Sequence, residues 1–184
     1  VRFAVGSLLL VPVLLPLAPL VRVVPPGKGS SYYGWPEIAV NAEKWEDAVD
    51  VEDGVEGNMF FFAADYRDAA QLGYALWHYE LHEEPTETKA REAVTAEEPT
   101  LAHNVLGFPA LQYDYWDSPR THKGEHAVLV LARPDGREHI IEEAKKRFES
   151  IQHVERLPIR CLGRHLFDVD FYVCRNYRGP IASD

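Results

Sequence analysis

Two short groups of polar side chains have residue types and spacings suited to ligand binding. The first group, Asp65, Tyr66 and Arg67, directly follows an unbroken apolar run at residues 59–64. Such a run is typical of a strand buried on both faces, and helical spacing begins at Asp65. Ligands of open α/β folds collect at the carboxyl ends of strands. We therefore expect this group at the working edge, where Arg67 would pair a phosphate or carboxylate. The simpler interpretation is that Asp65 only caps a helix and Arg67 is a solvated helix residue.

The second group is Gln112, Asp114 and Trp116, within the aromatic-rich segment 107–116. Aromatic rings beside a carboxylate and an amide suit sugar recognition, because rings stack on the apolar faces of sugars and polar groups meet the hydroxyls. The alternative is an aromatic cluster that seals the edge of the sheet. The sequence leaves both interpretations open.

Other chemistries receive less support from the residues present. His78 and His82 have the i, i+4 spacing of a metal pair, but Tyr79 stands where the zincin motif requires Glu. Nucleophile-elbow, phosphate-loop and dinucleotide fingerprints do not occur in the sequence. We therefore predict no catalytic residue, no metal and no cofactor. The net charge of −10 and pI of about 5.3 argue against a nucleic-acid partner.

The elements that would position these groups alternate between helix and strand. Apolar spacing predicts, in chain order, a helix at 35–49, a buried strand at 59–64, a helix from 65, a brief strand at Tyr79 and Leu81, a buried strand at 127–132, a helix at 140–148, strands at 151–157 and 159–162, and an alternating antiparallel strand at 166–175. This order predicts an α/β domain with a mixed sheet flanked by helices. The order of the strands in the sheet is not readable.

The first 24 residues differ from the rest of the chain. No charged residue occurs between Phe3 and Val21, and a run of this length can cross the hydrocarbon core of a bilayer. A secretory signal is the competing interpretation, but no clear cleavage site follows the run. We predict a transmembrane helix at 1–24, a linker at 25–34 and a folded domain at 35–180.

The two cysteines, Cys161 and Cys174, are too few for a disulfide framework. They are expected to be ordinary buried thiols. In an extracytoplasmic domain they would pair if they lay on neighbouring strands.

A series of motifs follows the predicted membrane helix and linker. After Gly34-Trp35 come the segments 61–67 (FFAADYR), 112–116 (QYDYW), 126–130 (HAVLV), 147–150 (RFES) and 172–179 (YVCRNYRG). In this order and spacing they resemble the C-terminal end of bacterial membrane glycosyltransferases of the dolichyl-phosphate-mannose–protein mannosyltransferase type. The resemblance covers nearly the whole chain, to about residue 180.

The resemblance implies a cell-membrane enzyme that takes a sugar from a polyprenyl-phosphate donor and passes it to a lipid, glycan or protein acceptor. In that family the catalytic acids lie between earlier membrane helices, so no catalytic role carries over to this chain. The implied domain is an extracytoplasmic appendage that aids acceptor binding or caps the membrane portion. Six residues would contact the ligand: Asp65, Tyr66, Arg67, Gln112, Asp114 and Trp116. The alternative is a non-catalytic, membrane-tethered interaction or structural module.

Overall fold

The computed structural model describes residues 33–53, 58–83, 100–161 and 163–180. The predicted membrane helix at 1–24 and all but the last two residues of the predicted linker lie outside this part of the chain. None of the described helices is long and apolar enough to cross a membrane.

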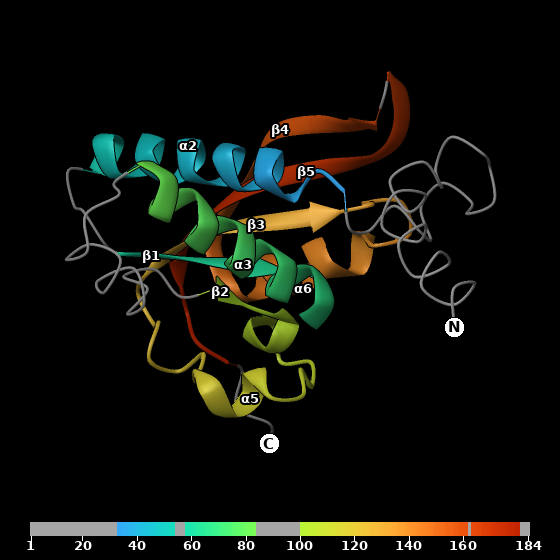
Figure 1. Ribbon diagram of the computed structural model, residues 1–184. Coiled ribbons are helices and arrows are strands. Elements are labelled where there is room, and N and C mark those ends of the chain that lie inside the picture. The colour runs from blue at the N-terminus through green and yellow to red at the C-terminus, as the bar shows by residue number, and fades with distance from the viewer. Residues whose placement is uncertain (1–32, 54–57, 84–99, 162, 181–184) are drawn as a thin grey trace, which may run out of the picture.

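The described residues form a five-stranded sheet with helices on both faces (Figure 1). The predicted α/β class, with a mixed sheet flanked by helices, is confirmed, although β2 was not predicted. The strand order is β2-β1-β3-β5-β4. The first three strands of that order run parallel, and β5 is antiparallel to both β3 and β4. The strands are β1 (Met59–Ala63), β2 (Thr100–Leu101), β3 (His126–Ala132), β4 (Phe148–Cys161) and β5 (Arg164–Tyr177).

Two long helices cover one face of the sheet, α2 (Trp35–Asp53) and α3 (Tyr66–Glu83). The other face is covered by α6 (Glu138–Arg147) and the short 3-10 helix η2 (His103–Leu106). A one-turn helix, α5 (Tyr113–Trp116), lies below the sheet in the view of Figure 1. The result is a three-layer α/β arrangement, which explains why β1 and β3 are apolar on both faces.

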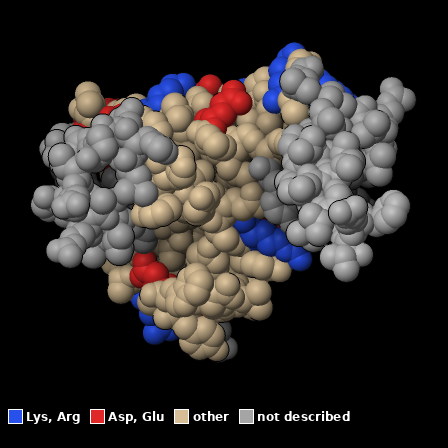
Figure 2. Space-filling view, viewed as in Figure 1, with Lys and Arg blue, Asp and Glu red and all other residues tan. Residues whose placement is uncertain are grey.

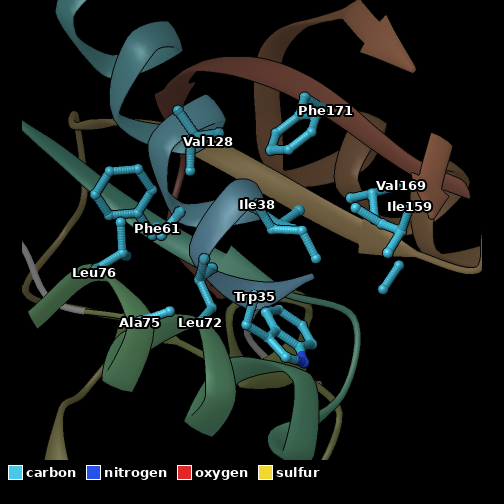
Figure 3. Close-up of a cluster of buried hydrophobic side chains, with 14 of the residues drawn as sticks. Trp35, Ile38, Phe61, Leu72, Ala75, Leu76, Val128, Ile159, Val169 and Phe171 are labelled. Atoms are coloured by element: carbon cyan, nitrogen blue, oxygen red, sulfur yellow. The ribbon is translucent and has the colours of Figure 1, made fainter. Parts of the chain in front are cut away.

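The core under α2 and α3 is built from side chains of both helices and of alternate strand residues (Figure 3). Ile38 and Leu72 are fully buried there against Phe61 of β1. Phe60 and Phe62 point to the opposite face of β1 and pack in a second core, under α6 and η2. Because successive strand residues point to opposite faces, the three consecutive phenylalanines supply both cores.

The second core is largely aromatic. The rings of Phe62 and Phe148 stack with centroids 5.7 Å apart and planes 9° from parallel. Tyr177 is fully buried beside them, and its hydroxyl donates a hydrogen bond of 2.7 Å to the carbonyl oxygen of Val105. Burial raises the pKa of Tyr177 to about 12. This bond ties the end of β5 to η2.

Several sequence predictions about element boundaries are wrong. The helix expected at 140–148 ends at Arg147, and Phe148 begins β4. Tyr79 and Leu81 do not form a strand, because α3 continues through both residues to Glu83. The separate strands expected at 151–157 and 159–162 are one continuous strand, β4. Pro158 lies within β4 without ending it, because β4 is an edge strand whose outward backbone groups need no ladder partner.

The structure decides the question of the two cysteines. Cys161 lies opposite Arg164, whereas Cys174 lies opposite Ile151, at the other end of the β4–β5 hairpin. At about 3.3 Å per residue along a strand, this spacing puts the two thiols roughly 30 Å apart, far beyond disulfide reach. Both are free, with Cys174 fully buried as predicted and Cys161 half-buried.

Candidate functional site

The first predicted group lies at the carboxyl end of β1. Asp65 caps α3: its Oδ1 accepts hydrogen bonds from the backbone N–H of Arg67 at 2.7 Å and of Asp68 at 3.4 Å. Its carbonyl oxygen accepts the N–H of Ala69 at 2.9 Å. The capping interpretation of Asp65 is therefore confirmed. One carboxylate oxygen is also 4.0 Å from Nη2 of Arg137.

Tyr66 and Arg67 form a stacked pair on the first turn of α3. The Arg67 guanidinium carbon lies 5.3 Å from the centre of the Tyr66 ring, and its Nε donates to the Tyr66 hydroxyl at 3.1 Å. Arg67 is exposed and Tyr66 is half-buried. The side of α3 that faces the carboxyl end of β1 thus carries a guanidinium held over an aromatic ring.

The second predicted group lies on and beside α5. Tyr113 is buried, and burial raises its pKa, whereas Trp116 is 70% exposed and Tyr115 is 89% exposed. The aromatic residues of this segment thus differ in burial. Tyr113 seals the edge of the sheet, and Trp116 presents its ring to solvent. Gln112 is exposed beside it.

Polar contacts hold α5 in place. The carboxylate oxygens of Asp114 lie 3.0 and 3.2 Å from the backbone nitrogen of Ala110, whose N–H they accept. The side chain of the buried Asn104 accepts from the N–H of Ala102 and donates to the carbonyl of Tyr113, both at 3.1 Å. Nε2 of His103 lies 2.8 Å from the carbonyl oxygen of Pro109. Because a carbonyl only accepts, Nε2 carries the proton in this contact.

The structure brings the two predicted groups to one edge of the sheet. A small cluster contains Ala63 of β1, Ala69 of α3 and Tyr113 of α5, together with Ala102 and Ala110, and Tyr66 packs against it. Apolar packing therefore joins the Asp65–Arg67 turn to the α5 segment. The shared edge is where β1 and β2 have their carboxyl ends.

Sequence reasoning missed an ion network at the same edge. Asp68 is 2% exposed and binds two arginines, with Oδ1 2.7 Å from Nη2 of Arg133 and Oδ2 3.0 Å from Nη1 of Arg137. Asp68 lies in the first turn of α3, and Arg133 directly follows β3. The helices that follow these two adjacent parallel strands lie on opposite faces of the sheet, a topological switch point where α/β folds often bind ligands. In this protein, the ion pairs of Asp68 with Arg133 and Arg137 occupy the switch point.

A second polar cluster follows α5. His122 is 7% exposed, and its ring lies 5.0 Å from that of Phe60. Its Nε2 is 2.8 Å from a carboxylate oxygen of Asp117, and its Nδ1 is 2.7 Å from one of Glu125. The sequence signal for this cluster was weak, since three polar residues in a loop are normally solvated. The buried ring folds the loop after α5 back onto the sheet.

The architecture defines a mixed-sheet α/β protein with an aromatic segment at the carboxyl edge of its parallel strands. No family model, no curated protein and no solved structure matches the chain. Within the described ranges, no group of three His, Cys, Asp or Glu side chains could hold a metal ion. The groups that this edge presents to solvent include the indole of Trp116, the amide of Gln112 and the guanidinium of Arg67, which can bind a polar ligand.

Proposed function

We propose that this chain is the C-terminal, extracytoplasmic part of a membrane glycosyltransferase that uses a polyprenyl-phosphate sugar donor. In this proposal its α/β domain helps to bind the lipid, glycan or protein acceptor. The single observation that carries the binding role is the 70% exposure of Trp116 on an otherwise firmly anchored segment. An exposed indole on an anchored segment offers a flat apolar face on which a sugar ring can stack at little conformational cost.

Within the proposed site, Trp116 stacks on a sugar ring, and Gln112 and the Asp114 carboxylate meet the hydroxyls. Tyr66 and Arg67 extend the site along the shared edge, where the guanidinium pairs with a negatively charged group of the ligand. Asp65 positions this pair by capping the helix that carries it.

The test is the affinity of the full chain for oligosaccharides and for polyprenyl phosphate, measured by isothermal titration calorimetry in detergent. Trp116→Ala should weaken sugar binding about tenfold or more, the order of a lost stacking contact, and Arg67→Ala should weaken binding of the phosphate. Trp77→Ala is the matched control, because Trp77 is 38% exposed but lies on α3. Wild-type affinity in both Trp116→Ala and Arg67→Ala would exclude this site.

The second candidate function is a non-catalytic interaction or structural module. It is favoured by two of the candidate ligand-binding carboxylates, Asp65 and Asp114. Both already accept hydrogen bonds from backbone N–H groups of the protein itself. Under this alternative, Trp116→Ala changes no sugar affinity. Thermal unfolding adds a second comparison: truncating the buried Trp35, which is 4% exposed, should cost about 3–5 kcal/mol, whereas a Trp116 with only a binding role should cost little.

A further inference from the structure

Three apolar side chains project into solvent from one short segment. Among the described residues, seven large hydrophobic side chains are exposed, and three of them are Leu111, Tyr115 and Trp116. We call these three the aromatic wedge; their exposed fractions are 56%, 89% and 70%. Figure 2 shows that the surface over α5 is almost entirely uncharged, with red and blue atoms only at its edge. Three large apolar side chains exposed within six residues are typical of an interaction site.

The backbone of the wedge is strained in a way that keeps it outside. Leu111 has a φ of +56°, a left-handed conformation that is a real outlier for a bulky side chain. Strain of this kind persists where the surroundings enforce it, and it is concentrated at functional sites. The hydrogen bonds of Asp114 to Ala110 and of Asn104 to Tyr113 enclose this residue on both sides. The fold therefore keeps Leu111 in this conformation, with its side chain 56% exposed.

The loop after the wedge carries two exposed bases, while the carboxylate of Asp114, on α5 itself, accepts the N–H of Ala110. In the loop that follows α5, the acids Asp117 and Glu125 are both turned onto the buried His122. The bases of this loop, Arg120 and Lys123, are exposed, and neither has an acidic partner within the described part of the chain.

A third base comes from the chain after β5. The N–H of Gly124 donates to the carbonyl of Tyr177 at 2.8 Å, so this segment lies beside the loop. Arg178 is exposed there, and it too has no acidic partner among the residues that the structure describes. We call Arg120, Lys123 and Arg178, which lie on the loop after α5 and on the segment beside it, the basic rim; the net charge of the chain is −10.

We propose that the aromatic wedge and its basic rim dock onto the surface of an anionic lipid bilayer. Trp and Tyr favour the headgroup level of a membrane because one end of the side chain is apolar and the other polar. Arg120, Lys123 and Arg178 would pair with lipid phosphates. The inference deepens the proposed function and rests on it for placing the chain at a membrane. It names the surface on which a lipid-linked acceptor would meet Gln112 and Asp114.

The experiment is a fluorescence measurement on the full chain reconstituted with lipid vesicles. Cys161→Ser removes the half-buried thiol, and burial raises the pKa of the Cys174 thiol, which keeps it unreactive. Tyr115→Cys then carries an environment-sensitive nitrobenzoxadiazole label. Val51→Cys is the matched control, because Val51 at the end of α2 is 85% exposed, close to the 89% of Tyr115.

In mixed phosphatidylcholine–phosphatidylglycerol vesicles, the label at position 115 should shift to the blue, rise several-fold in emission and be quenched by spin-labelled lipid, while the label at position 51 does not. Replacing Arg120, Lys123 and Arg178 by Gln, or adding salt, should reduce the shift. Equal, water-like emission at positions 115 and 51 would overturn the proposal. So would a shift that appears without lipid together with a dimer in light scattering, since a second copy would then cover the wedge.

The outcomes also separate this inference from the proposed function. Sugar binding that depends on Trp116, without lipid contact at position 115, rejects the inference alone. Lipid contact without sugar or polyprenyl-phosphate binding rejects the acceptor-binding role alone.

Discussion

At the scale of single residues, Asp170 is a buried acid with unusually complete pairing. Burial of its carboxyl, 2% exposed, opposes ionisation, but a bidentate contact with Arg156 at 2.6 and 2.7 Å outweighs that effect, and His153 adds to it. The pKa of Asp170 is consequently held below its usual value. Asp170 stands in the strand predicted from alternation at 166–175, and its partners from β4 offset the cost of burying its charge.

The lowered pKa of Asp170 predicts the acid side of the stability profile. A carboxyl whose folded pKa is depressed stabilises the fold above its unfolded pKa, near 4, and that stability is lost as the pH falls through the lower folded value. Asp170→Asn should cost about 1–2 kcal/mol at neutral pH, a modest figure because Arg156 is half exposed. The cost should shrink at about pH 3. Urea unfolding at the two pH values measures it, and Asp168→Asn, at a half-exposed site, is the control. A cost that does not change with pH would contradict the assignment.

Leu111 gives a prediction of opposite sign. Leu111→Gly removes the left-handed strain at φ +56°, which should stabilise the folded state by about 1–2 kcal/mol. Glycine also makes the unfolded chain more flexible, which lowers the free energy of unfolding by about 0.5–1 kcal/mol. The variant should be as stable as the wild type or up to about 1.5 kcal/mol more stable, with weaker contact to lipid. Thermal unfolding measures the first effect. A clear destabilisation would mean that packing of the Leu111 side chain outweighs its strain.

At the scale of elements, the sequence predicted the parts whose pattern is local. The apolar run at 59–64 and the helical spacing after it correspond to β1 and α3, and the run at 127–132 corresponds to β3. The strand expected at Tyr79 and Leu81 failed because a two-residue alternation was given more weight than helix continuity. No Gly or Pro interrupts the chain between Gly73 and Pro85, so nothing there ends the helix.

The join between α2 and the β4–β5 hairpin provides an element-scale prediction. A Cβ placed on Gly34, at φ +84°, would lie 2.5 Å from Cγ2 of the buried Ile159. Gly34→Ala should therefore cost the left-handed strain of about 1–2 kcal/mol plus about 1–3 kcal/mol of overpacking. Gly136→Ala is the matched control, since Gly136 has φ +76° and nothing within 4 Å. Equal midpoints in denaturant for the two variants would show that Ile159 moves aside freely.

At the scale of the whole molecule, the candidate site was only partly readable in advance. Asp65–Arg67 and the α5 segment could be identified because each is a local motif. The network of Asp68, Arg133 and Arg137 could not, because it depends on β1 and β3 being neighbours with parallel carboxyl ends, and strand order is not encoded in local spacing. Likewise, the ring of His122 is buried only because the loop after α5 folds back onto Phe60.

The Asp68 network predicts which of two neighbouring acids holds the layers of the molecule together. Asp68 joins α3, on one face of the sheet, to Arg133 and to Arg137 at the start of α6, on the other face. Asp68→Asn should cost about 3 kcal/mol, the low end for breaking a buried ion pair, because both arginines are about one-fifth exposed and can regain water. Asp65→Asn should cost less than about 0.5 kcal/mol, because Asn caps a helix as well as Asp does. Urea unfolding of both variants makes the comparison, and equal costs would show that the fold does not depend on this link between the two helical layers.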